Sequence, residues 1–141
     1  REVDWVFLGM APEGADPYLA ENHSFVLDFT AYPEKLASLD LDLAMAPLEL
    51  PPFNEAKSNL RLLEYGILGW PVICTDILPY QTDNPPVTRL PNITERWIAA
   101  IRERIADRPE LAREGDAMRA WVRQHYLLQN HLDKWFSAFV R

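Results

Sequence analysis

Cysteine is nearly absent from this sequence. Cys74 is the single one, so a disulfide framework and a cysteine-rich metal cluster are both excluded. No apolar run approaches the ~20 residues that cross a bilayer, and the start carries no signal-peptide pattern. A lone cysteine suits a reducing compartment, so we expect a cytoplasmic protein in which Cys74 is a buried, inert thiol.

Basic residues are scarce in the first two thirds of the chain. Residues 1–93 hold 14 acids and five bases, a net charge of −9, whereas residues 94–141 hold seven acids and nine bases, a net charge of +2. A field of this sign repels nucleic acid, so we exclude nucleic-acid binding. Two of those five bases, Lys57 and Arg61, lie four residues apart, which makes them the natural contacts for an anionic ligand.

What the sequence does contain is enough apolar material for a core. The 141 residues are 48% hydrophobic and include five Trp, which argues against disorder and favours one domain over residues 1–141. The chain begins with Arg1 and enters an apolar run almost at once. We therefore expect it to be a piece of a longer protein.

Short apolar runs and helical patterns alternate along the chain. Strands are expected at 4–10, 25–30, 42–47, 72–76 and 87–90, the last at a sheet edge. Helices are expected at 32–39, 58–69, 94–108, 110–126 and 128–140, and loops at 11–24 (with one helical turn), 48–56 and 77–86. Thr94 is the expected N-cap of its helix.

This order predicts the α/β class, a Rossmann-like, mostly parallel sheet with helices on both faces, followed by a helical part at 94–141. In such sheets ligands bind at the carboxyl ends of the strands. The three terminal helices are expected to bury apolar faces that include Trp97, Trp121 and Trp135 and the residues Ile98, Ile101, Ile105, Leu111, Met118, Val122, Tyr126, Leu128, Leu132 and Phe139.

The helix expected at 58–69 carries a carboxylate inside an apolar stripe. Leu60, Leu63, Ile67 and Leu68 recur at helical spacing and predict one apolar face, and Glu64 falls among them. Leu62 and Tyr65 make the opposite side apolar too, so we expect the helix to be covered on both sides. An unpaired buried charge is costly, so Glu64 needs a partner or an opening to solvent. Trp70, in the turn that ends the helix, is a candidate cover for a ligand cleft or for another domain.

Binding of a phosphate-containing ligand is one explanation of this arrangement. A helix N-terminus attracts anions, and Lys57 and the Ser58 hydroxyl stand at that end. Glu64, about 9 Å further along at roughly 1.5 Å per residue, could accept hydrogen bonds from sugar hydroxyls. The alternative is a capped core helix with Glu64 bonded to a neighbouring loop amide, and the residues alone leave both open.

Three segments resemble one enzyme family. "FNEAKSNLRLLEYGILGWPVICTD" (53–76) is similar to the donor-binding segment of retaining GT-B glycosyltransferases of the glycogen-synthase and sucrose-synthase type. "DLDLAMAP" (40–47) and "WVRQHYLLQNHLDKWFSAF" (121–139) resemble the family's preceding strand and C-terminal helices. The resemblance implies the C-terminal half of a GT-B enzyme, without its first strand and without the acceptor-binding domain.

The resemblance also implies roles for particular residues. The donor would be a nucleotide diphosphate sugar, used with retention and without a cofactor or required metal, in bacterial surface-polysaccharide or O-antigen synthesis. Glu64 would hold the ribose, while Lys57, Ser58, Asn59 and Arg61 would lie at the diphosphate or donor sugar, Lys57 as the catalytic stabiliser of the leaving diphosphate. The loop from Thr30 to Tyr32 would contact the base. This hexosyltransferase piece alone is expected to be inactive.

The family's first glutamate is missing. Ala56 occupies its position and Glu55 is one residue away, so either the loop shifts to let Glu55 contact the donor sugar as a second catalytic residue or the sugar is held differently. The Asp40-Leu41-Asp42 run spells a metal-binding D-x-D, but acidic chains often contain one, and we expect no metal there. His23, His125 and His131 have no metal-ligand spacing and are expected at the surface or core edge.

Two interpretations remain beside the donor site. The arginines of 96–108 form a solvated face or, alternatively, a peripheral contact with anionic lipid of the inner membrane. The rival function is a non-catalytic flavodoxin-like interaction module, with a receiver-type signalling domain as a special case, in which Lys57 and Glu64 are structural.

Overall fold

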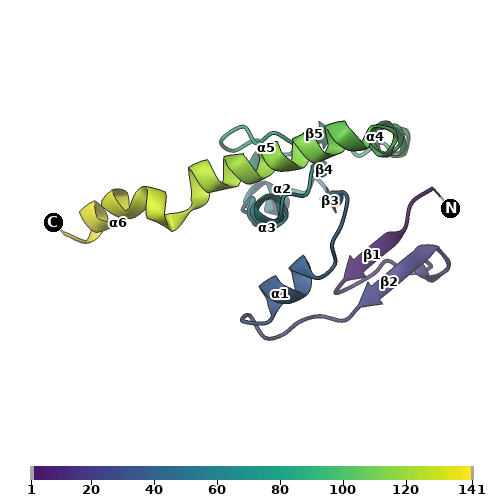
Figure 1. The fold of residues 1–141 in the computed structure, drawn as a ribbon, viewed down its shortest axis with the longest axis horizontal. Helices are drawn as coiled ribbons and strands as arrows, with labels where there is room; N and C mark the ends of the chain where they lie inside the picture. Colours follow the sequence, from purple (N-terminus) through teal and green to yellow (C-terminus); the bar gives the residue numbers. More distant parts are fainter. Residues whose placement is uncertain (1, 141) are drawn as a thin grey trace. The chain divides into compact units, whose positions relative to one another are not determined.

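The computed structural model describes residues 2–140, which belong to two compact units, Arg1–Asp40 and Leu41–Arg141 (Figure 1). Both units contain parallel sheet and helix, so the α/β class is confirmed. The strands form two sheets, of two and of three strands, where the sequence predicted one. The assignment of residues 1–141 to a single donor-binding domain stays a prediction.

The first unit is built on one parallel strand pair. β1 (Trp5–Leu8) pairs with β2 (Leu19–His23), and η1 (Asp16–Tyr18) supplies the single helical turn expected between them. Gly9 ends β1 with φ +106°, a conformation that favours glycine, and its amide donates to the His23 carbonyl at 2.8 Å. The unit closes with α1 (Tyr32–Ala37), which begins at a Tyr-Pro pair as predicted.

The strand predicted at 25–30 is wrong, because β2 lies earlier, in the segment assigned to a loop. The apolar residues of 25–30 are largely exposed, Leu27 at 89% and Phe29 at 92%. The Asp28 carboxylate accepts from the Thr30 amide at 2.8 Å, which closes a local turn. Such side-chain turns compete with ladder pairing, and the alternation of apolar residues does not reveal them.

The second unit holds a three-stranded sheet in the order β3-β4-β5. β3 (Ala44–Ala46), β4 (Val72–Thr75) and β5 (Thr88–Leu90) are all parallel, and β5 lies at an edge as predicted. β4 is rich in β-branched residues, and every one of its side chains is buried. The sheet therefore forms the centre of this unit's core.

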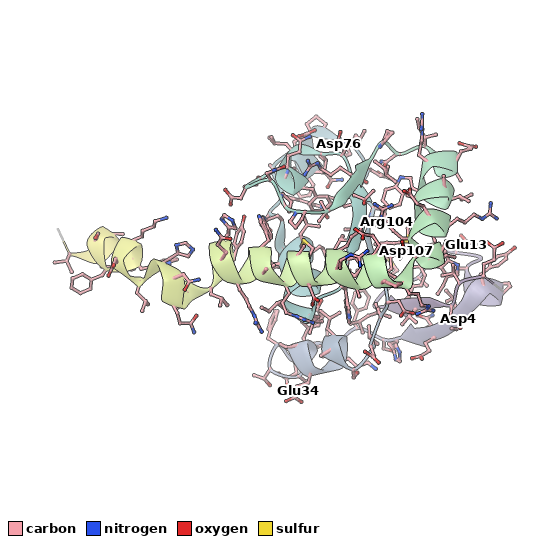
Figure 2. All side chains as sticks on the ribbon, turned by 45° about the horizontal axis from the view of Figure 1, so that its top comes forward. Asp4, Glu13, Glu34, Asp76, Arg104 and Asp107 are labelled. Atoms are coloured by element: carbon pink, nitrogen blue, oxygen red, sulfur yellow. The ribbon has the colours of Figure 1, made fainter. Side chains whose placement is uncertain are left out.

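Seven helical elements accompany this sheet among the described residues: α2 (Pro52–Glu55), α3 (Leu60–Leu68), η2 (Leu78–Tyr80), α4 (Thr94–Ala106), α5 (Arg108–Tyr126), η3 (Leu128–His131) and α6 (Leu132–Phe139). α2 and η2 lie in segments predicted as loops. Thr94 is the first helical residue and Ile93 the N-cap, so the predicted Thr94 cap is wrong. Asp107 separates α4 from α5 by accepting from the Glu110 amide at 3.0 Å, beside Pro109 (Figure 2).

The prediction that α3 is covered on both sides is right for the Leu62 side and wrong for the stripe that begins at Leu60. Leu62 is fully buried, whereas Leu60 and Ile67 are 55% and 38% exposed. The reason is α5, which packs on the Leu62 side, where Gly66 lies against Met118 and Val122. Periodicity identified an apolar stripe, but it could not show on which side α5 packs.

The predicted burial of aromatic residues is right for Trp121 and wrong for Trp135, whereas Trp70, expected as a cover for a cleft or for another domain, is buried. Trp121 is 7% exposed. Trp70 is 6% exposed and lies 6.0 Å from the Tyr65 ring, so it is part of the core and covers no cleft. Trp135 is 55% exposed because α6 packs on η3 and continues past the end of α5 (Figure 1). Four further residues predicted in the core of the C-terminal helices are exposed as well: Ile98, Leu128, Leu132 and Phe139.

Candidate functional site

The turn that precedes α3 places a lysine and a serine at the carboxyl edge of the sheet. β3, α3 and β4 form a parallel crossover, and the start of the helix in such a unit lies at the carboxyl ends of the strands. Lys57 and Ser58 are both exposed there. The Lys57 ammonium lies 5.5 Å from the centre of the Phe53 ring, a cation–π contact that holds the side chain along α2.

Glu64 is tolerated in α3 because its stripe is turned away from α5. Its carboxylate forms an ion pair with the Arg61 guanidinium at 3.2 Å, and the two side chains are 21% and 56% exposed. A partly solvated pair on one helix contributes only about 0.3–0.5 kcal/mol. Arg61 and Glu64 are therefore brought together by the structure, and both side chains keep part of their surface exposed.

Asn59 forms a side-chain hydrogen bond inside the protein. It is 9% exposed, and its amide donates to the Tyr126 hydroxyl at 2.7 Å. That hydroxyl donates in turn to the Asp83 carboxylate at 2.7 Å, and the Trp121 indole donates to the Asp83 carbonyl at 2.9 Å. Burial, together with the bond to Asp83, raises the pKa of Tyr126. Asn59 thus anchors the start of α3 to α5.

Sequence reasoning missed this network. Asp83 and Asn84 both adopt positive φ, 57° and 47°, in a turn that the Thr-Asp-Asn-Pro-Pro run could have signalled. Tyr126 was recognised only as a core residue. The link between these residues spans more than forty positions, and no local pattern encodes it.

A second missed network fixes the carboxyl edge of the sheet. The fully buried Thr75 hydroxyl, at the end of β4, accepts from the Leu48 amide at 2.8 Å. It lies 2.9 Å from the Asn92 side-chain oxygen, and the Asn92 amide donates to the Leu48 carbonyl at 2.7 Å. These bonds fix the position of the segment that leads from β3 to α2. The Lys57-Ser58 turn follows α2 and is therefore attached to an ordered segment.

The remaining predicted site residues fall in two places. Glu55 is exposed at the end of α2, with Ala56 as the C-cap. Thr30 and Tyr32 belong to the first unit. The Thr30 amide and hydroxyl both donate to the Asp28 carboxylate, which lowers the pKa of Asp28. Tyr32 is the first residue of α1 and is half-buried.

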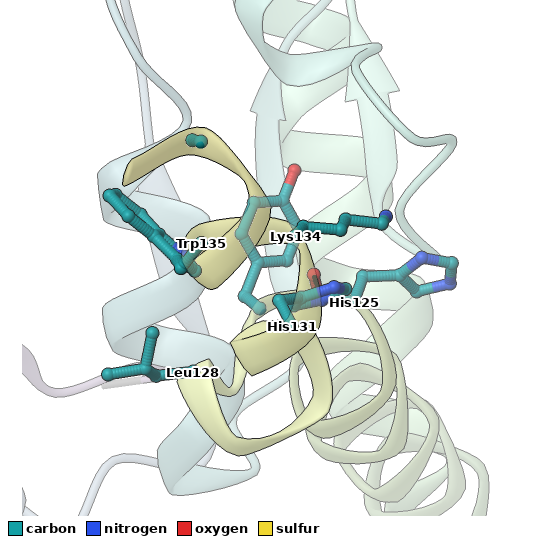
Figure 3. A pocket seen from close by; sticks show the side chains of 7 residues that line it. His125, Leu128, His131, Lys134 and Trp135 are labelled. Carbon is teal, nitrogen blue, oxygen red and sulfur yellow. Dashed lines mark hydrogen bonds between the residues drawn. The ribbon is translucent and has the colours of Figure 1, made fainter. Parts of the chain in front are cut away.

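Two cavities lie in the second unit, and neither is lined by Lys57, Ser58 or Glu64. The larger, of about 530 Å³, lies between the end of α5, η3 and α6 (Figure 3). The smaller, of about 120 Å³, lies beside the ion pair of Asp42 with Arg108, whose atoms are 2.9 Å apart. Asp42, the second acid of the D-x-D run, is therefore paired with a base.

Within residues 2–140, no cluster of three or more His, Cys, Asp or Glu side chains is placed to hold a metal ion. Burial raises the pKa of the Cys74 thiol to about 12, as expected of an inert cysteine. The three histidines are exposed or half-buried, as predicted.

The arginines of α4 are only in part a solvated face. Arg104 (Figure 2) is 17% exposed and lies 3.2 Å from Glu114 of α5. Arg102 is exposed. None of the helices described between residues 2 and 140 has both the length and the apolar character that a bilayer span requires.

No protein-family model, curated protein or solved structure matches this chain in the comparisons.

Proposed function

We propose that this chain binds the nucleotide diphosphate sugar of a retaining GT-B glycosyltransferase, with the diphosphate at the turn before α3. The observation that carries the proposal is the placement of Lys57 and Ser58, exposed, at the carboxyl edge of a parallel sheet, followed along the same helix by the accessible Arg61–Glu64 pair. The resemblance of residues 53–76 supports it.

Each of these groups has a chemical role in the proposal. The Lys57 ammonium and the N–H groups at the start of α3 would stabilise charge on the departing diphosphate. Glu64, about six residues and ~9 Å further on, would accept hydrogen bonds from the ribose hydroxyls, with Arg61 released toward phosphate. No required metal enters this scheme, because the positive charge comes from the chain. Transfer would serve surface-polysaccharide or O-antigen synthesis.

Two observations favour the rival, a non-catalytic flavodoxin-like interaction module. The Asn59 amide bonds inside the protein, and the two cavities described lie away from the Lys57-Ser58 turn. In that case the network around Tyr126 serves packing alone.

Calorimetric titration with the diphosphates of uridine, guanosine and adenosine tests the proposal. We expect saturable binding of one of them, weakened at least about tenfold by Glu64→Ala, because a ribose hydrogen bond to a charged group contributes about 1.5–3 kcal/mol. Lys57→Ala should weaken binding by a similar factor, since its partner is the diphosphate.

Matched controls are Glu103→Ala, an acid 79% exposed on α4, and Lys134→Ala, an exposed base on α6. Both should bind the nucleotide as the unaltered chain does. Absence of binding to all three diphosphates, or equal losses in the controls, would exclude the donor site and favour the interaction module.

A further inference from the structure

The C-terminal end of the second unit exposes large apolar side chains over η3 and α6. We define the C-terminal apolar face by these residues: Leu128, Leu132, Trp135, Phe136, Phe139 and Val140. Each is between 55% and 81% exposed. A contiguous exposed patch of this kind marks an interaction site in a folded protein.

The α6 part of this face forms a single helical stripe. Leu132, Trp135, Phe136 and Phe139 recur at three- and four-residue spacing, so they share one side of the helix. The rings of Trp135 and Phe139 stack with centres 6.5 Å apart. Asp133, Lys134 and Ser137 fall outside the stripe, which makes α6 strongly two-sided.

The surroundings of this face are basic in an otherwise acidic protein. The 530 Å³ cavity at its flank is lined by His125, His131 and Lys134 together with Trp135 (Figure 3). Residues 120–140 contain two bases, Arg123 and Lys134, and one acid, a net charge of +1, whereas residues 1–119 contain 20 acids and 11 bases, a net charge of −9. The charge around the C-terminal apolar face is thus opposite to that of the remaining chain.

We propose that the C-terminal apolar face lies in the interface of an anionic lipid bilayer. α6 has eight residues, about 12 Å at 1.5 Å per residue, so it is too short to span a bilayer and would lie in its plane. Trp and Phe are the side chains that partition into this region, and nearby bases gain from anionic headgroups. Lys134 and the two histidines at the cavity then face the lipid phosphates.

The charge around the C-terminal apolar face favours a lipid bilayer over a second copy of the chain as its binding partner. Pairing two such faces would bring the bases of both cavities close together, and like charges at an interface are unfavourable. The arginines of residues 96–108 are a poorer membrane contact than α6, because Arg104 and Arg108 are ion-paired with Glu114 and Asp42. This inference does not depend on the proposed donor site.

The test is flotation of the full chain with vesicles of phosphatidylcholine and phosphatidylglycerol at about 7:3, compared with phosphatidylcholine alone. We expect binding to the anionic vesicles, weaker binding to the neutral ones, and weakening with salt. Phe139→Ala should reduce partitioning at least about tenfold, because a whole apolar side chain is lost from the interface. Phe29→Ala is the matched control, since Phe29 is 92% exposed and Phe139 is 81% exposed.

Quenching of tryptophan fluorescence by brominated lipid gives a second measurement. Trp135→Phe keeps the face apolar, so the chain should still float while most of the quenching is lost. Equal partitioning into neutral and anionic vesicles, or equal losses for Phe139→Ala and Phe29→Ala, overturns the proposal. A dimer that Phe139→Ala dissociates, without flotation of either protein, overturns it in favour of a second copy.

Discussion

Burial raises the pKa of two side chains, Cys74 in β4 and Tyr80 in η2. Cys74 is fully buried in the central strand, and burial raises its pKa to about 12 from an ordinary value near 9. The nearby Tyr80 is 2% exposed, and burial raises its pKa to about 12 from 10. Both groups are neutral in the folded protein at physiological pH, so they pack as apolar groups.

Burial of Cys74 predicts resistance to thiol reagents and a loss of stability at alkaline pH. Because the folded pKa is the higher one, the contribution to stability is complete below pH 9 and falls as the pH rises toward 12, by up to about 1.4 kcal/mol per pH unit. Cys74 should react with a thiol reagent at pH 8 only after urea unfolding. Cys74→Ala should flatten the fall of the urea midpoint above pH 9, and rapid labelling of the native thiol would contradict this account.

At the residue scale, composition and spacing predicted some environments and not others. The inert state of Cys74 followed from a lone cysteine in an apolar run. The bond from Asn59 to Tyr126 did not, because the two residues are 67 positions apart and their approach depends on how α5 lies against α3. Glu64 was expected to have a partner or an opening to solvent, and its pairing with Arg61 agrees.

At the scale of elements, the contact between α3 and α5 organises the second unit. Glycine is needed where the two helices approach most closely. Gly69 ends α3 with φ +79°, and a Cβ added at Gly115 of α5 would overlap the Gly69 carbonyl oxygen. Arg119 donates to the Leu68 carbonyl at 2.8 Å and so satisfies the end of α3. The two helices therefore meet backbone to backbone.

Gly115→Ala should destabilise the protein although alanine favours helix. The substitution gains about 1 kcal/mol of helix propensity, but the overlap with rigid backbone forces α3 and α5 apart. Overpacking costs about 1–3 kcal/mol, so we expect a net loss of up to about 2 kcal/mol in the free energy of unfolding, measured from urea titrations. Asp116→Ala, one residue away and 77% exposed, is the control and should change the free energy by less than about 0.5 kcal/mol. A stabilised Gly115→Ala protein would refute the close contact.

At the scale of the whole molecule, the core lies almost entirely in the second unit. Among the described residues, Leu36 is the one buried apolar side chain of the first unit, while fifteen belong to the second. A two-stranded sheet with so little buried surface is marginal by itself. The two units should therefore differ in their ability to fold alone.

Residues 41–141 should fold as an isolated chain, and residues 1–40 should not. The longer piece keeps the three-stranded sheet and the α3–α5 contact, so it should show cooperative thermal unfolding and near-ultraviolet circular dichroism from its tryptophans. The shorter piece should give a disordered far-ultraviolet spectrum. A non-cooperative transition for residues 41–141 would show that its core requires the first unit.

The sequence by itself determined the α/β class, the parallel order around β3 and β4, the position of α3 and a helix break just before Pro109, because period, proline and charge act over a few residues. Tertiary structure alone decided which face of α3 is buried, why β2 replaces the strand expected at 25–30, and that Trp70 is enclosed while Trp135 stays exposed. Those outcomes depend on which element packs against which, and an apolar side chain becomes core only when another surface covers it.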